Sequence, residues 1–421
     1  MRVLWFTNTP SCYKPQKGGY NGGGWISSLE TEIKKKDGIE LGICFFLEDE
    51  NQKIQENNVT YYPIKTYKYS LKEKIERKFS FKKRKDNTFE FYINSFLQVI
   101  KDFNPDIINV FGSEDIFGSI AQYTKIPTVL HIQGIITPYY TAFCPPKYSF
   151  NSIIFENLNP FKILNAFRNI KGWHNNAKRE QKMLSHIPHF MGRTEWDKRI
   201  TKIYAPNAKY HHCDELLRDI FYNNSPYRIN NKTLTITTTI SPPYYKGFDT
   251  IIQAASILKH QLNVEFIWNV YGINNIKPYE KKFKINAKDC NINIGGIISQ
   301  ETLYSKLLET TVFVHPSYID NSPNSVCEAQ ILGCPVISTN VGGIPSLIEN
   351  YKTGLLIPAN DPYQMAFLIK EIFENKELAN NISKAGREVA QKRHNKKDII
   401  EKLINIYDSI IFQNIKNNSK D

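Results

Sequence analysis

Residues 311–349 read TVFVHPSYIDNSPNSVCEAQILGCPVISTNVGGIPSLIE, and this stretch decides the fold class of the chain. The run Thr311–His315 is β-branched and apolar, which is typical of a buried strand. A helix is predicted to begin near Asn324, and Pro335–Ser338 is a second buried strand. A strand, a helix and a strand in this order imply a mostly parallel sheet with helices packed on its faces.

The same alternation of strands and helices extends outward from this unit. Two series of βα units, each starting again from a strand, predict an α/β protein with two Rossmann-like, doubly wound domains. We place these domains at 1–205 and 228–396, with the join between them around 200–230 and a carboxy-terminal helix at 397–421. The strands that support this division are predicted at Val3–Thr7, Leu41–Leu47, Asp106–Phe111, Thr128–Ile132, His189–Gly192, Leu234–Ile240 and Glu265–Tyr271.

Composition excludes several classes of protein. The chain has 421 residues, of which 41% are hydrophobic and 23% charged, so it is neither a disordered chain nor a low-complexity fibre. No apolar run approaches the ~18–20 residues of a transmembrane helix, and the start lacks the pattern of a signal peptide. Seven cysteines form no CxxC pair, and His211–Asp214 has no second pair at ligand spacing, so we expect no metal. A cytoplasmic enzyme is the expectation.

The positive charge is concentrated in one segment. The formal net charge is +13, and 65–85 alone carries ten Lys/Arg against two Glu. Leu71, Ile75 and Phe79 recur at four-residue intervals, which gives a helix one apolar edge. Such a helix can lie on an anionic membrane, or it can pack its apolar edge on its own domain. No nucleic-acid-binding signature accompanies the charge, so nucleic acid is not a predicted partner.

Three segments at the transition from a strand to a helix can bind a ligand. The first is a loop at 17–25 with five glycines, including Gly23 and Gly24, whose backbone can approach a phosphate closely. It is neither a dinucleotide fingerprint nor a Walker A loop, and it can also be merely flexible. In the second segment, Lys246 directly precedes a helix, where it can neutralise a phosphate or simply be solvated.

The third segment carries two carboxylates eight residues apart. Asp320 follows a strand, and Glu328 lies about one turn inside an otherwise apolar helix. A carboxylate there needs partners, which ligand hydroxyls can supply, although it can also complement the helix dipole. The helix start, 324–326, offers side chains and N–H groups.

These motifs resemble the GT-B glycosyltransferases of family 4. The resemblance rests on Asp320…Glu328-Ala329, on Gly333-Cys334-Pro335-Val336-Ile337, on the Gly342-Gly343 turn and on Lys246-Gly247. It implies two Rossmann-like domains that face each other across a cleft, with the carboxy-terminal helix crossing back to the first domain. Within the family the chain is most similar to transferases that build bacterial capsule, O-antigen or exopolysaccharide.

The resemblance also implies roles for individual residues. Glu328 would bind the ribose of a nucleotide sugar, Asp320 would contact the donor sugar, and Lys246 would hold the diphosphate. The helix start, Asn324, Ser325 and Val326, would bind the donor as well. Such enzymes need no divalent metal, because cationic side chains and helix N–H groups neutralise the departing phosphate.

Residues outside the helix that begins near Asn324 complete the predicted site. Gly23 and Gly24 would close over the phosphates, His131 would hydrogen-bond near the reacting sugar, and Gly296 would lie by the base. Most relatives carry an Arg five or six residues before the lysine, and this chain has none there. Arg193 is predicted to take its place.

The sequence therefore predicts a retaining, metal-independent glycosyltransferase. It would move a sugar from a UDP- or GDP-sugar to a glycan acceptor, such as one linked to a polyprenyl diphosphate. An enzyme of this kind would be cytoplasmic or peripheral at the inner face of the plasma membrane. The alternatives are a nucleotide-sugar epimerase or hydrolase on the same scaffold, and a GT-B protein that binds nucleotide sugar without turnover.

Overall fold

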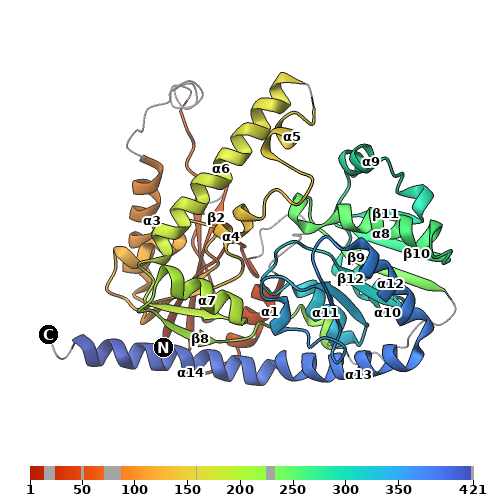
Figure 1. Cartoon of the computed structure of the whole chain (residues 1–421). Coiled ribbons are helices and arrows are strands. Elements are labelled where there is room, and N and C mark those ends of the chain that lie inside the picture. Colours follow the sequence, from red (N-terminus) through yellow and green to blue (C-terminus); the bar gives the residue numbers. More distant parts are fainter. Residues whose placement is uncertain (14–23, 49–51, 71–86, 158, 224–232, 419–421) are drawn as a thin grey trace.

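The computed structural model describes residues 1–13, 24–48, 52–70, 87–157, 159–223 and 233–418. Within these ranges the chain forms two sheets, each covered by helices (Figure 1). The predicted segment 65–85 falls outside the described residues from position 71 onward, and so does Gly23.

The first sheet has eight strands in the order β3-β4-β2-β1-β5-β6-β7-β8. All its pairs are parallel except β3 with β4. The strands span β1 Arg2–Phe6, β2 Glu40–Leu47, β3 Ile54–Glu56, β4 Val59–Lys65, β5 Ile107–Phe111, β6 Thr128–His131, β7 His189–Gly192 and β8 Lys209–His212.

The second sheet has six strands in the order β11-β10-β9-β12-β13-β14, and all its pairs are parallel. The strands span β9 Leu234–Thr239, β10 Phe266–Tyr271, β11 Ile292–Gly296, β12 Val312–His315, β13 Val336–Thr339 and β14 Leu355–Ile357. The prediction of two Rossmann-like domains is therefore confirmed.

Helices cover both faces of each sheet, because each sheet has a separate apolar cluster on either side. The first domain carries α1 Gly24–Ile33, α3 Asn87–Phe103, α4 Ile136–Thr141, α5 Phe150–Ile154, α6 Pro160–Leu184 and α7 Glu195–Tyr204. The second carries α8 Phe248–His260, α9 Lys277–Phe283, α10 Gln300–Leu308, α11 Asn324–Leu332, α12 Pro362–Glu374 and α13 Lys376–Arg393.

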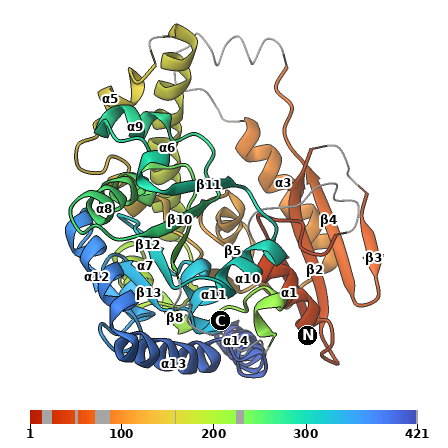
Figure 2. The same cartoon turned by 90° about the vertical axis from the view of Figure 1, so that its right-hand side faces the viewer.

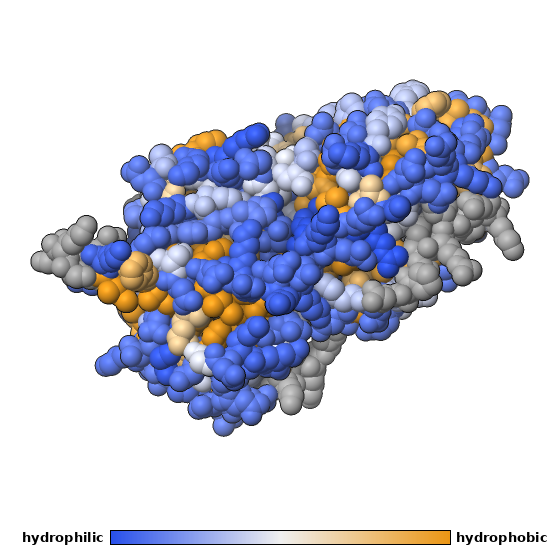
Figure 3. Space-filling model, turned by 90° about the horizontal axis from the view of Figure 1, so that it is seen from below, coloured by the Kyte–Doolittle hydropathy of each residue, from blue (hydrophilic) through white to orange (hydrophobic). Residues whose placement is uncertain are grey.

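The last helix, α14 Lys396–Asn418, returns to the first domain, as predicted. Figures 1 and 2 show α13 along the lower edge of the second domain and α14 continuing beneath the first. The Tyr407 hydroxyl accepts hydrogen bonds from Trp5 Nε1 at 3.2 Å and Asn109 Nδ2 at 2.8 Å, so α14 is fixed to the centre of the first sheet. Figure 3 shows apolar atoms beside the end of α14, where Phe412 and Ile415 are exposed.

Two sequence expectations need correction. The mixed sequence of 143–171 suggests a long loop or an irregular helix, with a regular helix only from Gly172. In the structure α6 begins at Pro160, because Asn159 caps it and proline is favoured at the first position. The boundary predicted at 205 is also too early. Strand β8 lies at 209–212 and pairs with β7, but its sequence, KYHH, lacks the apolar residues of a recognisable strand.

Candidate active site

The strand order of the second sheet places two predicted residues side by side. The order reverses between β9 and β12, and ligands of open α/β sheets bind beyond the carboxyl ends of the strands at such a reversal. Lys246 follows β9, and Asp320 follows β12. Their side chains meet, with Lys246 Nζ 2.7 Å from Asp320 Oδ2.

Asp320 is held as a carboxylate by several donors. His315 Nε2 lies 3.1 Å from Asp320 Oδ2, and the backbone N–H of Asn321 donates to Oδ1 at 3.1 Å. Burial opposes ionisation, but Lys246 and His315 together hold the pKa of Asp320 well below its usual value. The cluster therefore presents one ammonium group and one ionised carboxylate at the edge of the sheet.

A glycine sets the approach of Lys246 to this cluster. Gly247 has φ +84°, in the left-handed region, and a Cβ there would lie 2.1 Å from the carbonyl oxygen of Pro316. Only glycine allows the backbone after Lys246 to pack this closely against the loop that carries Asp320.

The first domain reaches the same cluster through α4. The Tyr139 hydroxyl donates to Asp320 Oδ1 at 3.4 Å, and its ring lies 5.5 Å from that of Tyr245. The Lys246–Asp320 pair is therefore at the junction of the two domains.

Glu328 has a partner that sequence reasoning missed. Arg218, in the connection between the domains, donates to both carboxylate oxygens of Glu328, from Nε at 2.8 Å and Nη2 at 2.7 Å. Burial raises the pKa of Glu328, and Arg218 opposes this rise. A Cβ on Gly24 would lie 3.1 Å from the Arg218 stem, so Arg218 contacts both the start of α1 and Glu328 of α11. No local sequence pattern predicts this pair, because Arg218 and Glu328 are 110 residues apart in the sequence.

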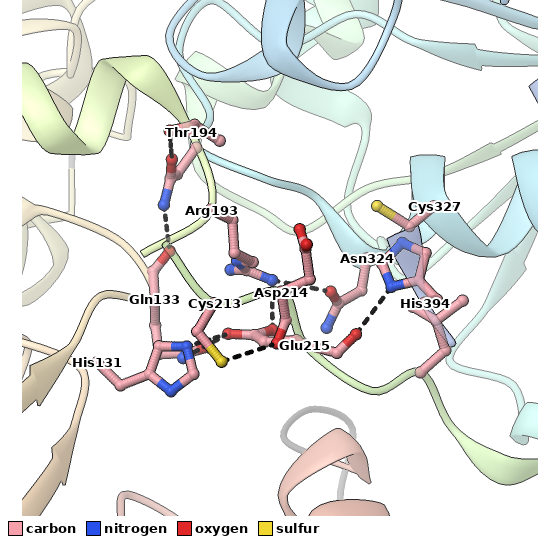
Figure 4. Close-up of polar contacts among 12 residues, drawn as sticks. His131, Gln133, Arg193, Thr194, Cys213, Asp214, Glu215, Asn324, Cys327 and His394 are labelled. Atoms are coloured by element: carbon pink, nitrogen blue, oxygen red, sulfur yellow. Dashed lines mark hydrogen bonds and ion pairs between the residues drawn. The ribbon is translucent and has the colours of Figure 1, made fainter. Parts of the chain in front are cut away.

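Glu215 connects both domains at a buried position (Figure 4). Its carboxylate accepts hydrogen bonds from Arg193 and, at 2.6 Å, from Gln133 Nε2, and its carbonyl oxygen lies 2.8 Å from His394 Nδ1. Burial raises the pKa of Glu215 to about 7, although Arg193 opposes this effect. Arg193 Nη1 also reaches Asn324 Oδ1 at 3.4 Å. Arg193 therefore lies at the start of α11 and pairs there with Glu215; its predicted role on the diphosphate stays a prediction.

His131 is buried beside this network (Figure 4). Its ring packs between Trp25 and Phe111, with centroid distances of 5.7 and 5.6 Å. Burial and the charge of Arg193 lower the pKa of His131 to about 3, so the ring is neutral near pH 7. Neither ring nitrogen makes a hydrogen bond among the described residues, and Nε2 lies 3.9 Å from Glu215 Oε1.

The remaining predicted donor residues are Gly296, Ser325 and Val326. Gly296 ends β11 with φ +63°, and a Cβ there would lie 2.7 Å from Asn274 Oδ1. The Val326 side chain is in the core of the second domain, and its N–H donates to the Pro323 carbonyl. Ser325 is half-buried at the helix start.

A second buried carboxylate follows β5 and was also missed. Glu114 Oε1 accepts a hydrogen bond from the backbone N–H of Gly134 at 3.0 Å, and burial raises the Glu114 pKa to about 7. The signal in the sequence was an acid directly after a buried strand, in the run FGSED.

No cluster of three or more His, Cys, Asp or Glu side chains that could hold a metal occurs in the described ranges. His189 Nδ1 and His211 Nε2 lie 3.2 Å apart, and His212 pairs with Asp214 at 3.1 Å.

Residues 225–389 match the family described as glycosyl transferases group 1. The chain is 30% identical over 158 residues to a protein of Salmonella typhimurium named as a colanic acid biosynthesis glycosyltransferase, WcaL, covering 35% of this chain and 38% of WcaL. It is 30% identical over 132 residues to the amylovoran biosynthesis glycosyltransferase AmsK of Erwinia amylovora, covering 30% of this chain and 32% of AmsK. The matches thus span less than half of these relatives.

Solved structures match over nearly the whole chain. The sucrose-phosphate synthase of Thermosynechococcus elongatus superposes with a TM-score of 0.73 at 15% identity, covering 98% of this chain and 99% of that one. Anabaena HepE, solved in complex with UDP and glucose, superposes with a TM-score of 0.64 at 12% identity, covering 97% and 99%. The chain has the GT-B fold, and its second domain matches the glycosyl transferases group 1 family.

Proposed function

We propose that this chain, with a glycosyl transferases group 1 domain inside a GT-B fold, is a retaining glycosyltransferase. It moves a sugar from a nucleotide diphosphate sugar to a hydroxyl of a glycan acceptor. The relatives named for colanic acid and amylovoran biosynthesis support bacterial surface polysaccharide as the product class.

The Lys246–Asp320 cluster carries this proposal. An ammonium group at the reversal point of the second sheet can stabilise the negative charge that develops on a departing diphosphate. The backbone N–H groups of Asn324 and Ser325, at the very start of α11, can add to this stabilisation. Cationic and backbone groups can therefore do the work of a divalent metal, which supports a metal-independent reaction.

The donor is a nucleotide sugar, with the ribose hydroxyls on Glu328 and the sugar beside Asp320. HepE, which has the same fold, was solved with UDP and with UDP-glucose, and this supports UDP as the nucleotide. His131, whose neutral ring makes no hydrogen bond among the described residues, is our candidate to contact the sugar.

Transfer with retention needs no enzymic nucleophile. The acceptor oxygen forms a bond to the anomeric carbon on the face that the nucleotide leaves, and the bond to the diphosphate breaks. The departing phosphate oxygen accepts the proton of the hydroxyl, and Lys246 neutralises the remaining charge. Asp320 stays ionised and contacts the sugar.

The acceptor is a sugar on a polyprenyl diphosphate at the inner membrane face. The described part of the chain contains no helix that is long and apolar enough to span a bilayer. The basic segment 65–85 is our sequence-based candidate for contact with anionic lipid.

A thermal-shift screen of UDP-, GDP-, ADP- and TDP-sugars tests the donor. A ligand at 100 times its Kd adds about 2.7 kcal/mol of stability. No shift with any of these donors would contradict the proposal.

Transfer assays with the identified donor test the site. Lys246→Ala and Glu328→Ala should each lower the transfer rate at least ~100-fold, or about 2.7 kcal/mol, without unfolding the protein. Lys352→Ala is the matched control, because Lys352 forms an exposed pair with Glu349 in the same domain. Near-normal transfer by either site variant would refute the assignment. Free sugar or an epimer released without acceptor would instead favour the hydrolase or epimerase.

A further inference from the structure

The first half of α6 carries large apolar side chains on its solvent-facing side. Phe161 is 78% exposed, Phe167 53% and Leu164 40%, and Phe155 at the end of α5 is 57% exposed. Figures 1 and 2 both show α5 and the start of α6 projecting beyond the rest of the first domain. Contiguous exposed apolar residues of this kind mark an interaction site.

The helical period explains why this surface faces outward. At 100° per residue, Phe161, Leu164 and Phe167 lie within an arc of about 120° on one side of α6. Ala177 and Leu184, which are buried, lie on the opposite side.

The same outward side carries four exposed basic residues. They follow the apolar tip along the helix as Arg168, Lys171, Lys178 and Lys182. None of the four has an ion-pair partner in the described ranges, and 157–179 contains no Asp or Glu. We define the α6 face as Phe155, Phe161, Leu164, Phe167, Arg168, Lys171, Lys178 and Lys182. An apolar tip followed by unpaired cations is complementary to an anionic bilayer, in which rings enter the interface and cations meet phosphates.

The α6 face is connected to the interdomain site by packed rings. Tyr140 of α4 lies 6.1 Å from Phe150 of α5, and Phe143 lies 5.7 Å from Trp173 of α6. Tyr140 directly follows Tyr139, which donates to Asp320. A surface that binds the α6 face is therefore connected to the side of the interdomain site that α4 forms.

We propose that the α6 face docks this protein on an anionic lipid bilayer. Aromatic rings at the tip enter the interface, and the cations along the helix bind lipid phosphates. The surface is distinct from 65–85. Docking itself does not depend on sugar transfer, so a failure of the proposed function leaves it standing.

Co-sedimentation of the full chain with phosphatidylcholine vesicles, with and without phosphatidylglycerol, tests the proposal. We expect binding only to the anionic vesicles and weaker binding at high salt. Arg168→Gln with Lys171→Gln should lower the partition coefficient about 25-fold, since each cation contributes about fivefold. Phe161→Ser with Phe167→Ser should lower it at least about tenfold.

The matched control is Tyr363→Ser with Phe367→Ser on α12. These rings are 73% and 58% exposed, but they share their helix with Glu371 and Glu374. This control should bind within about twofold of the wild type, and all variants should keep the far-UV circular dichroism of the wild type.

Binding at the wild-type level by either α6 variant overturns the proposal, and so does a loss of binding in the control that equals the loss in the α6 variants. Equal binding to vesicles without phosphatidylglycerol, or binding to neither kind, also overturns it. A further variant replaces the four basic residues at 82–85, in the basic segment 65–85, by Glu. Its binding through the α6 face should remain measurable. A loss of binding as complete as in both α6 variants together would assign docking to that segment instead.

Discussion

Replacement of Arg218 by Ala tests the Arg218–Glu328 pair. This pair holds the segment between the two domains against α11. Arg218 makes two hydrogen bonds to Glu328 through a side chain that is 24% exposed, whereas Glu328 is only 3% exposed. Without the guanidinium, Glu328 must either remain charged and unpaired or take up a proton.

The magnitude follows from the burial of the two partners. Removal of one member of a buried ion pair costs about 3–5 kcal/mol, and the partial exposure of Arg218 places this case at about 3 kcal/mol. For a domain of the size of the second one, that cost lowers Tm by about 6–12 °C. Glu328→Gln removes the charge but keeps an acceptor, so it should cost less than Arg218→Ala.

A double-mutant cycle separates the pair from other effects of each substitution. Arg218→Ala, Glu328→Gln and the combined variant, measured by urea unfolding, should show a coupling of about 2 kcal/mol. The control cycle uses Lys352→Ala and Glu349→Gln, an exposed pair at 3.0 Å, and should give less than ~1 kcal/mol. A coupling below about 0.5 kcal/mol for Arg218 and Glu328 would refute the reasoning.

Three further predictions concern the rest of the fold. Burial raises the Glu114 pKa to about 7, so the stability this group contributes is present below its unfolded pKa and lost as pH rises through about 7. The free energy of unfolding, measured by urea melts between pH 5 and 7, should fall less steeply with pH in Glu114→Gln, by up to ~1.4 kcal/mol per pH unit, and an unchanged slope would contradict this. Gly247→Ala should cost at least ~2 kcal/mol, because a Cβ would lie 2.1 Å from the Pro316 oxygen at φ +84°. Gly172→Ala, in the open interior of α6, should instead stabilise by ~0.5–1 kcal/mol, and equal effects would be inconsistent with the geometry. Tyr407→Phe leaves two buried donors unpaired and should lower the free energy of unfolding by ~2–3 kcal/mol in thermal or urea melts; no change would argue against docking of α14.

The sequence by itself determined the fold class and the centre of the site. Short apolar, β-branched runs indicate buried strands, so the two βα series could be assigned from the local sequence pattern alone. Lys246 and Asp320 each follow such a strand, and parallel strands bring their carboxyl ends to one edge, so their neighbourhood was predictable as well.

Only the tertiary structure decided the pairings across the domains. Glu328 needed a partner, but nothing local indicated Arg218, because ion pairs over long sequence separations depend on how the two domains pack. In the same way, Arg193 reaches the predicted helix start, but the structure places Glu215 against its charge.

The α6 face shows the same limit at the surface. Hydrophobic periodicity identifies a helix when its apolar side faces the core, and it fails when apolar residues face outward. Phe161 and Phe167 therefore made 160–171 look irregular, although Asn159 caps a regular helix there. A local pattern records which residues prefer to be buried, whereas the packing of the whole chain decides which of them remain exposed.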